Sequence, residues 1–395
     1  MLALVWGSAS ALVRAADFDQ DKLRHDVRAA LQKFVDHQDL AGAIGVVGTS
    51  QGVVCLEPVG KLTLDSESPL AADAIFRIAS MTKPITALGL MQLVEQGKLA
   101  VDDPVEKYLP EFQGQMLVAE KSADSLTLKR PRHPILIREL LTHTSGMPDL
   151  PPGLSDLYTK RDKTLAEEIM AMSQRPLNFE PGSKWSYCNT GLDTAGRIIE
   201  VVAKQRYEDY LAEHVFRPLQ MKDTTFYATP EQRPRLAGLY AQKDGKLVSA
   251  GHYLIGASEN AKLPIPAGGL LSTGADLAKL YQALLHQGEL NGHRVLGAET
   301  LATMTKTQTG DLVTGFTPGM SYGFGFAVLK HPQGVTEMLS PGTFGHGGAF
   351  GTQSWADPVQ DVFVILLIQR VGLPNGDASD MRRDLQRAAY GAIKH

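Results

Sequence analysis

The pattern of hydrophobic and polar positions predicts a helix and then a β-hairpin in the N-terminal part of the chain. In residues 18–37 apolar side chains recur at helical spacing, Leu23 and Leu31 among them. Two apolar runs follow, 43–47 and 53–56, on either side of a turn that contains two glycines. Two such runs around a glycine-containing turn are typical of a hairpin.

The middle of the chain has a helical pattern, and its last third returns to strands. Helices are predicted at 85–94, 137–141, 165–172, 192–204, 210–216 and 275–286, with a further helix ending at Met304. A small hairpin is predicted within 236–252. Strands are predicted at 322–328, within 345–356 and at 362–368, before a last helix at 380–393.

This order of elements predicts an α/β (α+β) fold. An antiparallel sheet is built from the N- and C-terminal segments and flanked by helices, and a mostly helical lobe is inserted into it. We predict a discontinuous α/β domain, 17–115 and 290–395, and a helical domain, 116–289, with the active site in the cleft between them. The polar segment 113–134, predicted to be irregular, marks the change from one domain to the other.

One predicted helix, 85–94, has almost no polar face, which indicates that it is buried on all sides. Pro84 fits the first turn of this helix, where its missing N–H has no cost, and Gly97 supplies the stop. Ser80 therefore lies at the mouth of a core helix, with Lys83 one turn further along the same face.

Ser80 and Lys83 are candidates for nucleophilic catalysis. A serine hydroxyl attacks poorly until a base takes its proton, and a lysine amine serves as that base when burial lowers its pKa. The helix N-terminus adds oriented N–H groups where an oxyanion forms. The spacing alone equally fits an N-cap serine followed by a surface lysine, so the choice depends on the rest of the chain.

Composition and charge exclude several other classes of function. The chain has 395 residues, of which 43% are hydrophobic and 21% charged, and its net charge is −4. Nothing in this balance indicates a nucleic acid or an anionic membrane surface as partner. The two cysteines, Cys55 and Cys188, have neither a disulfide pattern nor metal-ligand spacing. We predict no metal and no cofactor.

The first residues resemble a secretory signal peptide. Residues 1–13 form a short apolar segment, and residues 13–15 resemble a signal-peptide cleavage site before Ala16, although the basic n-region is missing. We expect 1–16 to be removed and the protein to be periplasmic or secreted; the alternative is a packed N-terminal segment in a cytoplasmic protein. No later run is long enough to span a bilayer.

Two further segments contain residues that often carry chemistry. The turn 48–52 spells Gly-x-Ser-x-Gly, but that motif needs a helix after it, and here a strand follows. We interpret Ser50 as a residue of a hairpin turn. The segment 142–149 gathers His143, two hydroxyls and Asp149, and we interpret it as a hydrogen-bonded turn beside the cleft.

Three short motifs stand in order along the chain: Ser80-x-x-Lys83, Tyr187-x-Asn189 and His346-Gly347-Gly348. Together they resemble the serine β-lactamase and penicillin-binding-protein superfamily. The resemblance is strongest to the class C β-lactamase branch, which includes the family VIII carboxylesterases. It covers nearly all of the chain after Asp17 and extends to the segments 140–146, 180–182 and 268–273, which recur as landmarks of that fold.

The resemblance implies roles for individual residues. Ser80 is the acylated nucleophile, and Lys83 and Tyr187 share the proton transfers. Asn189 orients Lys83 and binds the acyl side of the substrate. The backbone N–H groups of Ser80 and Ala349, the latter next to Gly348, form the oxyanion hole.

The chain departs from the superfamily at its third motif. β-Lactamases and DD-peptidases usually have Lys there, followed by Thr or Ser and Gly, and the first two contact a substrate carboxylate. His346 and Gly347 stand in their place, which weakens carboxylate binding by ~1.5–3 kcal/mol per lost charged hydrogen bond. We further expect the KM for carboxylate-bearing substrates to fall between pH 8 and pH 6, as His346 protonates near ~6.5.

These residues predict a serine hydrolase that forms an acyl-enzyme, a carboxylesterase for short acyl esters. A β-lactamase, a D-Ala-D-Ala carboxypeptidase or D-aminopeptidase, and a non-catalytic penicillin-recognising protein are the alternatives. The expected partner is a small ester or amide substrate. We expect neither nucleic-acid binding nor a membrane span, and the sequence leaves the oligomeric state open. If pocket shape sets the substrate, Trp185 and Trp355 are the expected aromatic walls.

Overall fold

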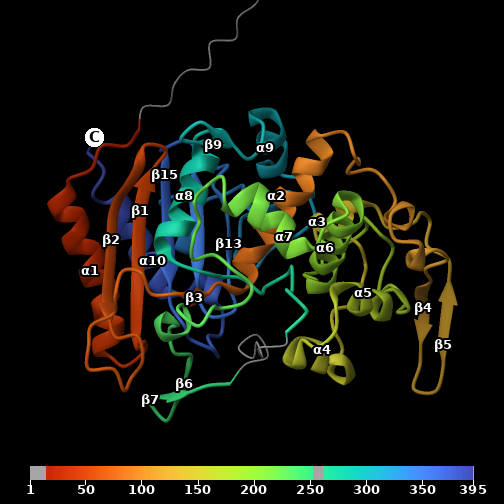
Figure 1. Cartoon of the computed structure of the whole chain (residues 1–395), viewed down its shortest axis with the longest axis horizontal. Helices are drawn as coiled ribbons and strands as arrows, with labels where there is room; N and C mark the ends of the chain where they lie inside the picture. Colours follow the sequence, from red (N-terminus) through yellow and green to blue (C-terminus); the bar gives the residue numbers. More distant parts are fainter. Residues whose placement is uncertain (1–14, 252–260, 395) are drawn as a thin grey trace, which may run out of the picture.

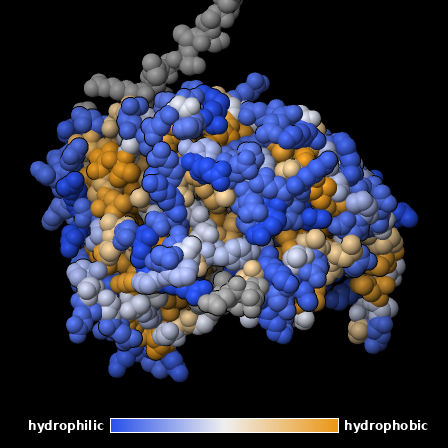
Figure 2. Space-filling model, in the orientation of Figure 1, coloured by the Kyte–Doolittle hydropathy of each residue, from blue (hydrophilic) through white to orange (hydrophobic). Residues whose placement is uncertain are grey.

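The structure is a computed structural model that describes residues 15–251 and 261–394. All but the last two residues of the predicted signal peptide, 1–16, lie outside the described residues. None of the helices described has the length and apolar character needed to cross a membrane. Hydrophilic residues cover most of the face shown in Figure 2, and hydrophobic residues gather on it in separate patches.

Strands from both ends of the chain form one seven-stranded antiparallel sheet within the described residues, as the hydrophobic pattern predicts. In spatial order the strands are β11 (Met320–Tyr322), β12 (Ala327–Leu329), β13 (Phe344–Gly347), β14 (Gln353–Asp357), β15 (Val362–Leu367), β1 (Gly42–Thr49) and β2 (Gly52–Gly60). The predicted strand 322–328 is thus two strands with a turn between them. β1 pairs with β15, which joins strands from the two ends of the chain in one sheet.

Helices cover both faces of this sheet (Figure 1). On one face α1 (Gln20–Asp36) and α10 (Asp380–Tyr390) pack against side chains such as Val47 and Val364. On the other face α8 (Gly274–Leu285) packs against β1, β14 and β15. Because side chains alternate along a strand, His346 and its partner Ser354 share the α8 face, whereas Gly347 and Gln353 face the side of α10.

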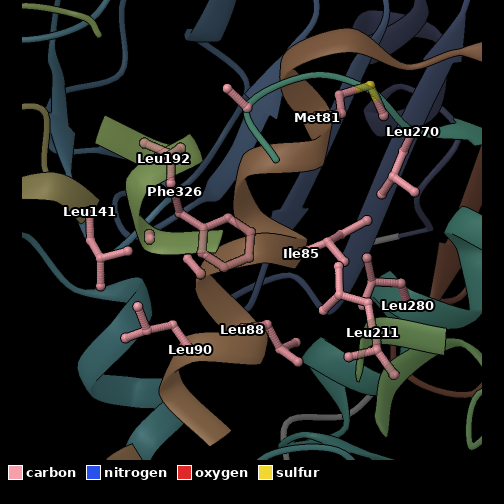
Figure 3. Close-up of a cluster of buried hydrophobic side chains, with 14 of the residues drawn as sticks. Met81, Ile85, Leu88, Leu90, Leu141, Leu192, Leu211, Leu270, Leu280 and Phe326 are labelled. Atoms are coloured by element: carbon pink, nitrogen blue, oxygen red, sulfur yellow. The ribbon is translucent and has the colours of Figure 1, made fainter. Parts of the chain in front are cut away.

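Helix α2 (Thr82–Glu95) is the centre of the molecule and is buried almost throughout, as its sequence predicts. It runs between the sheet and the helical lobe (Figure 1). Ile85, Leu88 and Leu90 point into a cluster that also holds Phe326 and Leu192 (Figure 3). The helix ends near Gly97, whose φ of +67° is the left-handed conformation that glycine accommodates best.

The helical lobe lies on the far side of α2 from the sheet. Its helices are α3 (Ile137–Leu141), α4 (Asp156–Lys160), α5 (Leu165–Ser173), α6 (Asn189–Ala203) and α7 (Tyr207–Leu211), the last continued by a π-helical turn, Ala212–Phe216. Among these, α6 begins three residues before the predicted start. A further helix, α9 (Ala298–Thr305), packs against α2.

Short strand pairs complete the described fold: β3 (Phe76–Arg77) with β8 (Leu271–Ser272), β4 (Leu117–Lys121) with β5 (Leu126–Lys129), β6 (Tyr240–Lys243) with β7 (Lys246–Ser249), and β9 (Glu289–Leu290) with β10 (His293–Arg294). The segment 113–134 is therefore not irregular, since β4 and β5 form an exposed hairpin in it. Also, α8 belongs with the sheet that it covers, although the predicted boundary at 289 assigns it to the helical domain.

Candidate active site

Ser80 lies in a short 3-10 turn, Ala79–Met81, directly before α2. Two hydrogen bonds hold this turn: the Ile78 N–H donates to the Leu270 carbonyl (3.0 Å), and the Thr82 hydroxyl donates to the Ala79 carbonyl (2.7 Å). Ala79 has φ +46°, a strained conformation for a residue with a side chain. The serine is half-buried and faces a cavity at the end of the core helix.

Lys83 is fully buried, which excludes the alternative of a surface lysine. Its ammonium donates to Ser80 Oγ (3.0 Å), Asn189 Oδ1 (2.8 Å) and the Ala267 carbonyl (2.7 Å). An ammonium has three N–H donors, and these three hydrogen bonds use all of them. A neutral amine in the same place keeps two of these bonds and presents its lone pair to the Ser80 hydroxyl. The geometry is therefore that of a base beside a nucleophile.

The electrostatic setting of Lys83 favours this neutral form. Burial is the largest effect and lowers the pKa of Lys83 to about 7, although the carboxylates of Asp193 and Asp149 oppose it. At neutral pH a substantial fraction of the lysine is consequently unprotonated and able to accept a proton.

Asp149 fixes the orientation of Asn189. The Asn189 side chain donates through Nδ2 to Asp149 Oδ2 (3.0 Å), and its backbone N–H donates to Asp149 Oδ1 (3.2 Å). Because a carboxylate only accepts, the amide nitrogen must face Asp149 and the amide oxygen must face Lys83. The segment 142–149 is thus the hydrogen-bonded turn that its sequence predicts, and it also orients a site residue.

A pair of buried carboxyl groups, which the sequence analysis did not single out, stands behind Lys83. Asp193 accepts the Ala267 N–H (2.7 Å) and the Tyr158 hydroxyl, and the Ala267 carbonyl accepts from Lys83. Glu168 is fully buried beside Asp193, and burial raises its pKa well above the ordinary value. Glu168 therefore keeps its proton, and burial also raises the pKa of Asp193, to about 7.

Tyr187 packs between Lys83 and His143. Lys83 Nζ lies 4.6 Å from the centroid of the Tyr187 ring, and the His143 ring lies 4.4 Å from it, tilted by 34°. Tyr187 and Ser80 line the same cavity. The structure thus brings the predicted nucleophile, the lysine and the tyrosine together.

Behind Tyr187 runs a chain of hydrogen bonds through His143, Tyr322 and His346. The Cys188 N–H donates to His143 Nδ1 (3.2 Å), and His143 Nε2 contacts the Tyr322 hydroxyl (3.3 Å). That hydroxyl contacts His346 Nε2 (2.6 Å), and His346 Nδ1 contacts the Gly347 carbonyl (2.6 Å). A backbone N–H starts the chain and a carbonyl ends it, so each donor can be assigned: His143 donates through Nε2, Tyr322 through its hydroxyl and His346 through Nδ1.

His346 is therefore a neutral, structural imidazole, and the expected protonation between pH 8 and pH 6 is wrong. Burial and the nearby Lys83 cation lower the pKa of His346 to about 3. Burial likewise holds the pKa of His143 well below its ordinary value. The expected fall in KM for carboxylate-bearing substrates cannot come from His346.

Gly348 allows the end of β13 to meet the turn that holds Ser80. A Cβ at this position would lie 2.2 Å from Thr352 Oγ1 and 2.5 Å from the Ile78 carbonyl, distances that no side chain tolerates. This close approach sets Ala349 and Ser80 on the wall of one cavity. The arrangement suits the predicted pair of backbone N–H donors.

The cavity has a volume of about 340 Å³, and its lining residues come mainly from the turn before α2, the end of β13 and the segment 373–377. Phe316, which is half-exposed, forms the aromatic wall that the sequence analysis missed. Its ring packs edge-on against Tyr187, at 5.1 Å between centroids. Trp185 does not line the cavity, contrary to the prediction: it stands behind these two rings, with its ring centroid 6.1 Å from that of Phe316 and 6.3 Å from that of Tyr187.

Trp355 does not line the cavity, which corrects the prediction of a second aromatic wall. It pairs with Gly345 and so faces the side of α10, opposite to His346. There it is buried in a cluster with Met320 and Leu329, and the Arg382 guanidinium lies 3.9 Å from its ring centroid.

Ser50 has no part in this site. Ser50 lies in the turn between β1 and β2, as its interpretation as a hairpin residue predicts, and its hydroxyl donates to Asp361 Oδ2 (2.8 Å). Cys188 is buried beneath the site, and burial raises the pKa of its thiol to about 12.

The fold and this arrangement define a serine hydrolase of the β-lactamase type. The Beta-lactamase family model matches residues 27–389, and the chain belongs to that family. Protein Rv1367c of Mycobacterium tuberculosis is 30% identical over 360 residues, which cover 87% of this chain and 89% of that protein. Esterase EstB of Burkholderia gladioli is 28% identical over 383 residues, covering 89% and 92%. The solved structure of EstCE1, a hydrolase with promiscuous acyltransferase activity, has the same fold, with a TM-score of 0.78 at 24% identity over 94% of this chain and 99% of that one.

Proposed function

We propose that this protein is a carboxylesterase that hydrolyses short-chain acyl esters through an acyl-enzyme on Ser80. The observation that carries the proposal is the contact between Ser80 and a fully buried Lys83 whose other two hydrogen bonds are already satisfied. The similarity to Esterase EstB over most of both chains supports the choice of an ester as substrate.

In the first half of the reaction, Ser80 Oγ attacks the ester carbonyl carbon while its proton passes to the neutral Lys83 amine. The carbonyl oxygen becomes an oxyanion held by the N–H groups of Ser80 and Ala349. The tetrahedral intermediate then breaks its bond to the alcohol oxygen. The alcohol leaves with a proton supplied through Lys83 and Tyr187, and the acyl group stays on Ser80.

In the second half, water attacks the acyl carbon and gives its proton to the same pair. The bond to Ser80 Oγ breaks, the serine recovers a proton, and the carboxylic acid leaves. Tyr187 is suited to this relay because its ring lies against Lys83 Nζ and it lines the same cavity as Ser80. No other group is needed for the balance of protons.

Uncharged esters suit this cavity better than β-lactams or D-Ala-D-Ala peptides do. His346 is neutral and its Nε2 is occupied by Tyr322, so it offers no charge to a substrate carboxylate. Gly347 offers no hydroxyl. Each lost charged hydrogen bond weakens carboxylate binding by ~1.5–3 kcal/mol.

Hydrolysis of p-nitrophenyl acyl esters, nitrocefin and a D-Ala-D-Ala peptide, measured side by side, tests the proposal. We expect the short esters to be hydrolysed with the highest kcat/KM. Ser80→Ala should lower it by at least about 10³-fold, because the nucleophile is lost, while Ser50→Ala should leave it unchanged.

Faster turnover of nitrocefin or the peptide than of the esters would instead assign the protein to the lactamase or peptidase alternatives. Acylation by penicillin without turnover of any substrate would make it a penicillin-recognising protein. Loss of activity in Ser50→Ala, with full activity in Ser80→Ala, would overturn the mechanism itself.

A further inference from the structure

Asp377 occupies the space beside Gly347 that a side chain would otherwise fill. It belongs to a short 3-10 turn, Gly376–Ala378, that follows the sheet. A Cβ built on Gly347 would lie only 1.8 Å from Asp377 Oδ1. The aspartate comes from a different element than Gly347, yet both residues line the cavity that contains Ser80.

Three hydrogen bonds hold Asp377 in place, one at its carboxylate and two at its backbone. Gln353, the cross-strand partner of Gly347, donates through Nε2 to Asp377 Oδ1 (2.8 Å). The Asn375 side chain accepts the Asp377 N–H (3.0 Å), and Arg382 donates to the Asp377 carbonyl (2.7 Å). Within the described residues no hydrogen bond reaches Asp377 Oδ2, so this oxygen is left for a group inside the cavity.

Among the described residues that line the cavity, Asp377 carries the formal negative charge, and none is a lysine or an arginine. Lys83 is fully buried at the base, where its hydrogen bonds are satisfied. Arg382 is also fully buried: its guanidinium packs against Trp355 and donates to the Asp377 carbonyl, and Arg382 does not line the cavity. A substrate group that approaches Gly347 therefore meets the aspartate first.

We propose that Asp377 selects substrates by charge: the corner of the cavity between Gly347 and Asp377 takes an ammonium group and disfavours a carboxylate. This proposal rests on the proposed esterase function and names its substrate class, an ester with a cationic substituent. The reason is direct, because a fixed charge in a partly enclosed site attracts the opposite charge and repels its own. The charge lies where the resemblance expects a hydroxyl that binds a carboxylate.

The test compares three p-nitrophenyl esters of matched length: butyrate, γ-aminobutyrate and hemisuccinate. A second series places the charge on the alcohol, with butyrate esters of propanol, ethanolamine and glycolate. The variant is Asp377→Asn, which keeps the shape of the side chain and removes its charge. Asp380→Asn is the matched control, because it removes the same charge three residues away and does not line the cavity.

We expect the unmodified protein to prefer the ammonium ester over the carboxylate ester in at least one series. Asp377→Asn should lower that preference by about fivefold or more at low salt, with the neutral ester changed by less than about twofold. Asp380→Asn should leave the preference unchanged. An ammonium-to-carboxylate ratio that does not move in either series overturns the proposal, even when the neutral ester is hydrolysed as expected.

Boronic acids keep the test independent of turnover, because they bind a serine nucleophile without being hydrolysed. The probes are para-aminomethyl and para-carboxy phenylboronic acid, and calorimetry measures their Kd with each variant. If no ester is hydrolysed, the esterase function fails, but a preference for the aminomethyl probe that Asp377→Asn removes still supports charge selection. Equal affinity for both probes in the unmodified protein contradicts it.

Discussion

The two walls of the active site differ in how they are built. On the α2 wall, Ser80 and Lys83 come from one helical turn, and the lysine is fully buried with three hydrogen bonds. On the β13 wall, His346 is neutral, Gly347 and Gly348 have no side chains, and the charge comes from Asp377 in another element. The first wall holds the proposed proton chemistry, and the second meets the substrate.

This difference indicates that reaction and selectivity depend on separate sets of contacts. A change behind Lys83 alters the protonation of the base, whereas a change behind β13 alters what the cavity accepts. The following experiments either separate these two effects or show that they are linked.

The largest effect is expected from the proton-transfer pair on the α2 wall. Lys83→Ala and Tyr187→Phe should each lower kcat by about 10²–10⁴-fold, because each removes a group that moves the proton. The double variant should lose little more than either single variant, since residues that act as one unit are non-additive. Steady-state kinetics on p-nitrophenyl butyrate measure this cycle, and losses that simply multiply would mean that the two residues serve different steps.

A smaller change is expected from the carboxyl pair behind Lys83. The Asp193 carboxylate raises the pKa of Lys83, so Asp193→Asn should lower it further. The proposed mechanism requires the neutral amine, so we expect activity to rise with pH through about 7. The acidic limb of the kcat/KM profile should therefore move to lower pH. The ratio of kcat/KM at pH 6 to kcat/KM at pH 8 should be about threefold or more higher in Asp193→Asn than in the unmodified protein.

Glu200→Gln is the matched control for this prediction. It also removes one carboxylate charge from α6 without changing the shape of the side chain, but Glu200 pairs with Arg197. Its pH profile should match that of the unmodified protein. A profile of Asp193→Asn that moves to higher pH, or that stays in place, would contradict the assigned influence on Lys83.

The α2 wall could be predicted from the sequence because its information is local. The spacing of Ser80 and Lys83 sets both on one helical face, and the apolar segment around them requires burial. The roles of Asp193 and Asp377 depend on contacts with distant segments, at Ala267 and at Gly347, that no local pattern shows. Trp355 was misassigned because the face of the sheet on which it lies depends on the register of β14. That register is set by pairing with β13, which the sequence alone does not show.

The hydrogen-bonded chain behind β13 should contribute mainly to stability. Tyr322→Phe leaves one nitrogen each of His143 and His346 without its partner in a buried setting. Such a loss costs about 1–3 kcal/mol of the free energy of unfolding, so Tm should fall by several degrees. We expect kcat to fall only severalfold, because both rings pack near Tyr187.

Tyr281→Phe provides the comparison. Tyr281 is also a buried tyrosine, and its hydroxyl contacts Ser354 Oγ (2.7 Å) on the next strand. We expect a similar fall in Tm by scanning calorimetry but an unchanged kcat, since Tyr281 does not line the cavity. If Tyr322→Phe lowers kcat as far as Tyr187→Phe does, then the chain takes part in proton transfer and the two walls are not separate.

The smallest effect is expected at Cys188, between Tyr187 and Asn189. Its thiol is buried against the Pro148 carbonyl, and burial raises its pKa to about 12, so neither the thiolate nor access is available to a reagent. A bulky thiol reagent should therefore leave the native protein active and should react with Cys188 and Cys55 only after denaturation. Cys188→Ala removes little volume and should keep kcat/KM within about threefold of the unmodified value. Rapid inactivation by the reagent, absent in Cys188→Ala, would show that the segment carrying Tyr187 and Asn189 opens, and that the α2 wall is less rigid than its hydrogen bonds indicate.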